Sequence, residues 1–305
     1  MKMRGKLKWI WSVCAVVVLA AGIGFWLRPV SYFNQFTYLR EALSGVKNHE
    51  VWVAGHRIHY ETEGPAAGPA VVLVHGLGGS AEDWRNLAPY LAKAGFHVYI
   101  PDLLGYGRSP KPADFSYSVQ AEAKVVVGFM IDLGLKRVDL GGWSMGGWIV
   151  QLIASEHPEM VRRLMLFDAG GLDVQPAWNT ALFSPKTPAQ LAQLEALLTP
   201  HTHRIPGFVA RDILRIERQK GWVVKRAMAS MLTGKDVTNG LLPKLKMPVL
   251  ISWGAQDHIF PVAQAETMHR LIPQSQLDVY AGCGHLAALH CARQMGPKVV
   301  AFVRE

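Results

Sequence analysis

The sequence predicts an α/β architecture in which a mostly parallel sheet is covered by helices on both faces. Short apolar runs alternate with stretches of helical periodicity from about residue 70 to 170, and again from residue 247 to the C-terminus. Some of these runs, such as "AVVLV" at 70–74, are apolar throughout, as expected of strands buried on both faces. With 305 residues and 50% hydrophobic content, the chain is long enough for one large α/β domain and a modest insertion.

The N-terminal region, residues 1–28, predicts a membrane anchor. Four basic residues within positions 2–8 precede residues 9–27, which carry no charge and have Trp near both ends. A helix of this length can cross a bilayer, and this flanking pattern favours an anchor over a buried core helix. The positive-inside rule then predicts a cytoplasmic N-terminus and an exported remainder, periplasmic in a bacterium. The alternative is a cleaved signal peptide, which would yield a secreted protein.

Residues 29–48 are predicted to link the anchor to a folded domain over residues 49–305. The linker crowds aromatic side chains at positions 32, 33, 36 and 38. It is either an interfacial segment lying on the membrane, where aromatic rings suit the headgroup region, or a linker helix packed on the domain.

The elements of the folded domain follow from periodicity and turn residues. Residues 50–55 and 56–64 alternate apolar and polar around a Gly-containing turn, which predicts a hairpin. Buried strands are predicted at 70–76, 97–102, 137–144, 162–170, 247–254 and 275–282. Helices are predicted at 82–95, 119–134, 146–158, 262–272 and 296–305. A helical insertion over about 171–242 interrupts this order, with helical stretches at 187–198 and 207–232 and no clear strand.

Charge and cysteine usage exclude two classes of protein. Five of the nine net positive charges precede residue 30, and the rest are spread over 275 residues, which argues against a nucleic-acid partner. Three cysteines do not make a disulfide framework. Cys14 lies in the predicted anchor, and Cys283 and Cys291 could pair in an oxidising compartment, although the sequence favours free thiols.

Ser144 is the predicted nucleophile. It lies in Gly-x-Ser-x-Gly, "GWSMG" at 142–146, where a predicted strand turns into a helix. Such a turn holds the serine in a strained conformation above the sheet, and the flanking glycines allow strand and helix to approach closely. The pattern alone is weak, but its place at a strand-to-helix junction makes it specific.

A serine hydroxyl needs a base, and the base needs a carboxylate to orient it. His285 follows the last predicted strand and is expected at the same sheet edge as Ser144; His290 is the rival. Asp257 is the predicted acid, because its short loop ahead of a helix can aim a carboxylate at the His285 loop. Asp168, after the preceding strand, is the alternative acid or a turn residue.

The loop "HGLGG" at 75–79 is predicted to supply an oxyanion hole from the backbone N–H groups of Leu77 and Met145. A phosphate-binding loop is the poorer interpretation, since its Lys and Ser/Thr are missing. Trp143, Phe208 and Trp222 are predicted to contact a substrate. Further apolar residues of the insertion could roof Ser144, namely Trp178, Phe183, Ile205, Met228 and Met231.

Together these residues resemble the α/β-hydrolase fold family: "HGLGG", "GWSMGG", "WGAQDHIFP" and "GCGH" stand in that family's order and approximate spacing over about residues 50–305. The N-terminal anchor, "DAGGL" and "TPAQL" are similar to those of membrane-associated monoacylglycerol lipases and related bacterial lipases and esterases. This resemblance implies an eight-stranded, mostly parallel sheet with a helical cap. It also implies a monomeric carboxylic-ester hydrolase that needs no metal or cofactor, works through an acyl-enzyme and acts on monoacylglycerols or short- and medium-chain esters beside membrane lipid.

Other chemistries of this fold are weighed from single residues. Relatives with an aspartate nucleophile, the epoxide hydrolases and haloalkane dehalogenases, do not fit a serine at 144. A C–C bond or amide hydrolase with the same three residues stays open. The acidic substrates of C–C hydrolases favour a nearby arginine, and the insertion contains Arg204, Arg211, Arg215 and Arg218, which are interpreted mainly as a solvated helix face or a surface for anionic lipid. A noncatalytic binding protein of this fold is the alternative from another class.

Overall fold

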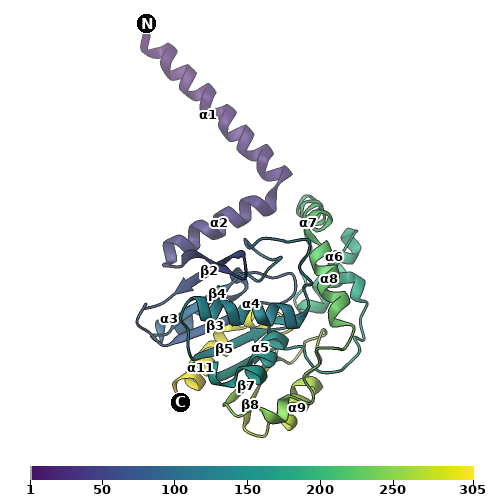
Figure 1. Ribbon diagram of the computed structural model, residues 1–305. Helices are drawn as coiled ribbons and strands as arrows, with labels where there is room; N and C mark the ends of the chain where they lie inside the picture. Colours follow the sequence, from purple (N-terminus) through teal and green to yellow (C-terminus); the bar gives the residue numbers. More distant parts are fainter. Residues whose placement is uncertain (1) are drawn as a thin grey trace.

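A single eight-stranded sheet forms the centre of the molecule, with the strand order β1-β2-β4-β3-β5-β6-β7-β8 (Figure 1). The computed structural model describes residues 2–305, with the side chains of all of these except residues 2–10, 12, 41 and 42. The strands are β1 Lys47–Val53, β2 His56–Glu63, β3 Ala70–Val74, β4 His97–Pro101, β5 Val138–Trp143, β6 Val161–Phe167, β7 Val249–Gly254 and β8 Ser275–Tyr280. The predicted hairpin β1–β2 pairs antiparallel and joins β4 antiparallel, while β3 to β8 run parallel.

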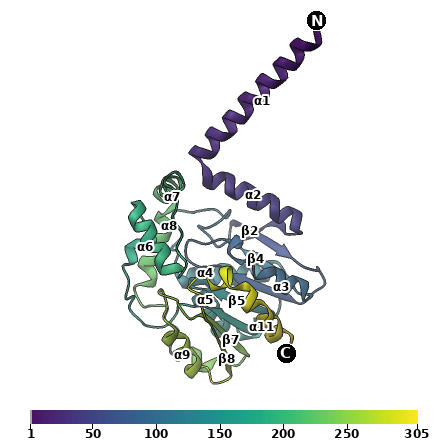
Figure 2. The same cartoon turned by 180° about the vertical axis from the view of Figure 1, so that it is seen from behind.

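Helices cover both faces of the sheet, as predicted. One hydrophobic cluster packs α4 Val119–Asp132, α5 Met145–Glu156 and α9 Val262–Leu271 against the first face. A second cluster packs α3 Ala88–Lys93, α10 Ala287–His290 and α11 Ala292–Arg304 against the other face, where α11 contacts α3 (Figure 2). The apolar run of β3 and that of β7, which is interrupted by Ser252, are therefore buried on both sides, which explains their lack of polar and apolar alternation.

The insertion after β6 forms a helical cap of α6 Pro188–Leu198, α7 Gly207–Lys220 and α8 Trp222–Met231. Within the described residues it contains no strand. Two predicted helices are shorter than expected. The helix expected at 82–95 is a short 3-10 turn, Ala81–Trp84, followed by α3, because Pro89 has no N–H and is accommodated in the first turn of a new helix. The stretch 207–232 is divided at Gly221 into α7 and α8.

Two N-terminal helices precede the sheet: α1 Lys2–Leu27 projects away from the domain, and α2 Pro29–Ser44 lies across it (Figures 1 and 2). In the part of the chain with described side chains, no single helix is long and apolar enough for a membrane span. Residues 13–27 and 29–40 meet the criterion only together, with a bend of 106° between them. The basic residues at 2–8 and Trp9, which support the predicted anchor, lie outside the described side chains.

The junction of α1 and α2 packs on the cap helix α7. The ring of Trp26 stacks on Phe208 with centroids 4.6 Å apart, and the N–H of Val30 donates to Asp212 Oδ2 at 3.1 Å. Further along α2, the guanidinium of Arg108 lies 3.7 Å over the ring of Tyr38. The linker is therefore a helix packed on the domain along one side.

The cysteines differ from expectation. Cys283 and Cys291 form a disulfide, with Cα atoms 6.2 Å apart, whereas Cys14 in α1 is free and exposed. The expectation of free thiols at 283 and 291 was wrong, because the turn of α10 brings back to Cys283 a residue eight positions further along the chain. This proximity cannot be deduced from a count of three cysteines.

Candidate active site

Ser144 occupies a strained turn between β5 and α5. Its φ of 57° lies in the left-handed region, which a serine adopts only where the surrounding structure enforces it. A Cβ at Gly142 would lie 2.3 Å from the carbonyl oxygen of Gly146, and one at Gly146 would lie 2.2 Å from that of Val74. The two glycines of the motif are therefore required by the backbone, and the turn places the buried serine at the carboxyl edge of the sheet.

His285 and Asp257 are placed beside Ser144 by the loops after β8 and β7. His285 Nε2 lies 2.9 Å from Ser144 Oγ, and His285 Nδ1 lies 2.8 Å from Asp257 Oδ2. The other carboxylate oxygen of Asp257 accepts the N–H groups of Ile259 at 2.7 Å and Phe260 at 2.9 Å. With the proton of His285 on Nδ1 and donated to Asp257, Nε2 is free to accept a proton from the Ser144 hydroxyl.

Asp168, the alternative acid, does not contact His285. It follows β6 with a φ of 43° and is fully buried. Its Oδ1 accepts the N–H of Gly254 at 2.7 Å, while Oδ2 has no hydrogen-bond partner among the described residues. Burial, and then the charge of neighbouring Asp257, raise the pKa of Asp168 well above its usual value. Asp168 therefore fastens the end of β7 to the end of β6, and His290 lies on the exposed side of α10.

The residues of the predicted oxyanion donors are both close to Ser144. Met145 follows it at the start of α5, and Leu77 lines the cavity that contains Ser144. Neither backbone N–H donates to another residue in the described part of the chain. His75 fixes the Leu77 loop, since Nδ1 lies 2.8 Å from the carbonyl of Gly76 and Nε2 accepts the N–H of Leu103 at 3.0 Å. The two N–H groups are thus available for a developing oxyanion.

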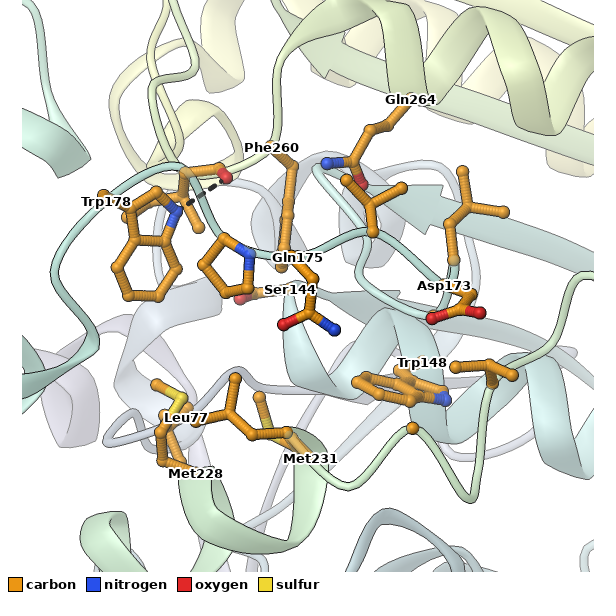
Figure 3. Close-up of a pocket in the computed structure, with 18 of the residues that line it drawn as sticks. Leu77, Ser144, Trp148, Asp173, Gln175, Trp178, Met228, Met231, Phe260 and Gln264 are labelled. Carbon is orange, nitrogen blue, oxygen red and sulfur yellow. Dashed lines mark hydrogen bonds between the residues drawn. The ribbon is translucent and has the colours of Figure 1, made fainter.

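Two cavities meet at Ser144. The first has mostly apolar walls, with the amide of Gln175 directed toward its centre and Gln264 at its rim (Figure 3). Its apolar wall includes Leu77, Trp148, Leu172, Trp178, Phe183, Met228, Met231, Ile259 and Phe260. The second is lined by Trp143, His285 and cap residues, together with Leu77, Ser144 and Phe183 of the first. Ser144 therefore lies where a mostly apolar cavity meets a second one that also contains the carboxyl groups of Asp83 and Glu217.

The predicted contact residues are divided between these cavities and other places. Trp143 lines the second cavity, and its indole N–H donates to the carbonyl of His285 at 2.7 Å. Phe208 and Trp222 line neither cavity: Phe208 stacks on Trp26, and Trp222 packs edge-on against Tyr117. These two expectations are corrected, because the apolar faces of α7 and α8 also pack against α1 and against the loop before α4.

Three features of the site were not anticipated from the sequence. Phe260 follows Asp257 by three residues and packs on His285, and its position in "QDHIFP" was the available signal. Asp83 lines the second cavity and caps a short helix through the N–H of Ser80 at 3.1 Å; burial raises its pKa. The disulfide of Cys283 encloses the His285 loop.

Neither a metal-binding group nor a cation for an acidic substrate is found at the site among the residues with described side chains. Among the residues with described side chains, no group of three His, Cys, Asp or Glu could hold a metal ion. Of the cap arginines, Arg215 pairs with Asp212 at 2.8 Å and Arg211 faces the ring of Trp26. No Lys or Arg lines either cavity within the described part of the chain.

Known proteins resemble this chain in sequence and in fold. A family model described as alpha/beta hydrolase fold matches residues 69–290. Lipase 1 of Psychrobacter immobilis is 25% identical over 82% of this chain and 81% of the lipase. A 2-hydroxymuconate semialdehyde hydrolase of Pseudomonas sp. is 29% identical over 84% of this chain and 93% of that enzyme. The crystal structure of a membrane phospholipase A, described as a bacterial virulence factor, covers 97% of this chain and 98% of its own at 26% identity, with a TM-score of 0.83.

Proposed function

The chain belongs to the alpha/beta hydrolase fold family and is a hydrolase, and we propose that it is a serine hydrolase that cleaves carboxylic esters. The observation that carries the proposal is the pair of hydrogen-bond distances joining Ser144, His285 and Asp257 at the meeting point of two cavities. A serine, a base and an orienting acid at these distances are what acyl transfer requires.

The proposed reaction passes through an acyl-enzyme. Ser144 Oγ attacks the ester carbonyl while His285 Nε2 takes its proton, and the carbonyl oxygen becomes an oxyanion held by the N–H groups of Leu77 and Met145. The C–O bond to the alcohol breaks as His285 returns the proton to the leaving oxygen. Water then attacks the acyl-Ser144 ester with His285 again as base, releasing the acid and restoring the serine.

The cavity walls favour a neutral ester over an acidic C–C substrate. A carboxylate-bearing dienone would leave a charge unpaired, since neither cavity has a Lys or Arg among its described lining residues. The carboxylates of Asp83 and Glu217 in the second cavity would repel such a substrate further. We propose monoacylglycerols or short- and medium-chain acyl esters as substrates, and similarity to a membrane phospholipase A adds phospholipids to the candidates.

A location at the membrane is proposed on the basis of the N-terminal helices. One side of α2 packs on the domain. The helix also exposes the apolar side chains of Phe33, Phe36 and Leu43, and 65% of the Phe36 surface is accessible to solvent. Exposed aromatic residues on such a helix suit the headgroup region. We propose a monomeric, single-pass anchored enzyme whose α1 crosses the bilayer and whose domain lies outside the cytoplasm, periplasmic in a bacterium.

Substrate class is tested on purified full-length enzyme in detergent, with Ser144→Ala as the matched control. The panel comprises p-nitrophenyl esters of increasing chain length, monoacylglycerol, phosphatidylcholine, a dienone acid and an anilide. We expect turnover of the esters and stoichiometric labelling by a fluorophosphonate, both lost in Ser144→Ala. Preferred turnover of the dienone acid would instead assign a C–C hydrolase, and labelling that persists in the variant would remove Ser144 as the nucleophile.

The location is tested separately by fractionation. An anchored protein stays with membranes through high-salt and carbonate washes and keeps its full mass. Release of a shortened soluble form would establish a cleaved signal peptide instead.

A further inference from the structure

The loop that carries His285 is enclosed by a disulfide. Cys283 stands two residues before His285, and its partner Cys291 stands between α10 and α11, so His285 lies inside the closed ring. α11 is fixed to the domain by Met295, Val299 and Phe302, all fully or nearly fully buried. The disulfide therefore joins Cys283, two residues before His285, directly to the start of α11, a helix of the hydrophobic core.

The backbone of this loop provides little rigidity of its own. Gly282 and Gly284 flank Cys283, and Gly282 adopts a φ of 75°, so two of the three residues before His285 have the widest conformational freedom of any residue type. Besides the hydrogen bonds of the His285 ring to Ser144 and Asp257, three hydrogen bonds from other parts of the described chain hold the backbone of the loop. Two come from the Asp257 loop and β5: the N–H of Gln256 donates to the carbonyl of Cys283 at 2.8 Å, and the Trp143 indole donates to that of His285.

The third bond comes from the cap. The N–H of Leu286 donates to the carbonyl of Leu198, at the end of α6, at 3.2 Å. Because the cap is itself a long insertion between β6 and β7, this hydrogen bond cannot alone set the position of His285 relative to Ser144. The main chain already joins His285 to the core through α10, whose Ala287 and Ala288 are buried. The disulfide adds a second covalent connection, which fixes Cys283, between the two flexible glycines, to the start of α11.

We propose that the Cys283–Cys291 disulfide positions His285 for proton transfer, so that the enzyme hydrolyses its substrate rapidly only in the oxidised form. This inference rests on the proposed function. On reduction the S–S bond accepts two electrons and two protons, and two thiols remain. A dithiol supplies both and becomes a disulfide, whereas a phosphine supplies the electrons and becomes a phosphine oxide, with the oxygen and the protons coming from water. Cys283 and Cys291 are positioning residues, since neither thiol contacts Ser144. A chain not yet exported from a reducing compartment would accordingly be a slow enzyme.

The test uses full-length enzyme in detergent, with and without a phosphine reductant, and thiol titration to establish the redox state. We expect reduction to lower kcat for a p-nitrophenyl ester by about 10- to 100-fold, the scale of an ångström-sized misplacement of a catalytic group, with KM changed by less than about two-fold. Fluorophosphonate labelling should slow by the same factor and still reach one label per molecule. Reoxidation should restore the rate.

Labelling separates positioning from folding. If the disulfide only stabilised the fold, reduction would lower the end point of labelling and leave the rate of the labelled fraction unchanged, and the proposal would be overturned. Cys283→Ser/Cys291→Ser should match the reduced enzyme and be insensitive to reductant. Cys14→Ser, which alters the remaining thiol far from the site, should respond to reductant as the wild type does. Equal kcat of fully reduced and oxidised enzyme also overturns the proposal, whereas an oxidised enzyme that cleaves no ester refutes the proposed function itself.

Discussion

Replacing Asp257 by asparagine should reverse the tautomer of His285 while preserving the fold. Asp257 uses one oxygen for the N–H groups of Ile259 and Phe260 and the other for His285 Nδ1. In Asp257→Asn the amide oxygen is required by the two backbone donors, so the NH₂ group must face His285. Nδ1 then becomes an acceptor, and the ring proton moves to Nε2, where it points at Ser144 Oγ.

The expected loss follows from that reversal. A histidine protonated at Nε2 cannot take the serine proton, and a variant with the wrong tautomer loses about 10⁴-fold in kcat, or about 5 kcal/mol of transition-state stabilisation. Steady-state hydrolysis of a short p-nitrophenyl ester measures kcat, and circular dichroism verifies the fold. Asp168→Asn is the matched control, since its carboxyl meets the N–H of Gly254 and not the imidazole. A tenfold or smaller loss for Asp257→Asn, or a comparable loss for Asp168→Asn, would refute this assignment of the acid.

Three further predictions concern stability. Gly146→Ala places a methyl group 2.2 Å from a carbonyl oxygen at the end of β3 and should lower the free energy of unfolding in urea by about 1–3 kcal/mol. Gly207→Ala, which has open space around it, should change that free energy by no more than about 0.5 kcal/mol. Equal effects of the two substitutions would show that the turn is not tightly packed. Burial raises the pKa of Asp168, so above pH 4 the folded state binds a proton that the unfolded state lacks. The free energy of unfolding should therefore fall as pH rises, and it should fall less steeply in Asp168→Asn. Equal slopes in the two proteins would contradict a protonated Asp168. Cys283→Ser/Cys291→Ser should lower the free energy of unfolding by about 2.5 kcal/mol, the loop-closure value for a separation of eight residues, and an unchanged urea midpoint would show that the ring does not constrain the unfolded chain.

The elements that carry the site could be predicted because parallel strands end at one edge of the sheet. Ser144, Asp257 and His285 each follow a short apolar run, and such runs in alternation with helices imply a parallel sheet. That rule brings the loops after β5, β7 and β8 to the same edge without any knowledge of strand order. Because the rule depends only on the direction of the strands, it predicts that the three loops meet, although their residues are spread over more than a hundred positions.

The cap contacts could not be predicted, because periodicity identifies an apolar face without identifying what covers it. Phe208 lies on the apolar side of α7, but Trp26 covers it. Nearby, a hydrogen bond joins Val30 to Asp212, which are 182 positions apart in the chain. Phe260 reaches the cavity from a loop with no periodicity at all. Distinguishing packing from substrate contact requires the position of the N-terminal helices relative to the cap, which depends on long-range packing.

The choice between the two aspartates shows the same limit at the level of single hydrogen bonds. Asp168 and Asp257 follow adjacent strands and lie side by side, and two buried carboxylates in contact cannot both be ionised at little cost. Asp257 accepts hydrogen bonds from two backbone N–H groups and has His285 Nδ1 at 2.8 Å, while Asp168 accepts one N–H. Those donors depend on how the chain turns at 257–260, a property of the folded loop. The sequence therefore provides two carboxylates at the correct edge, and the backbone of one four-residue turn decides which of them can orient the histidine.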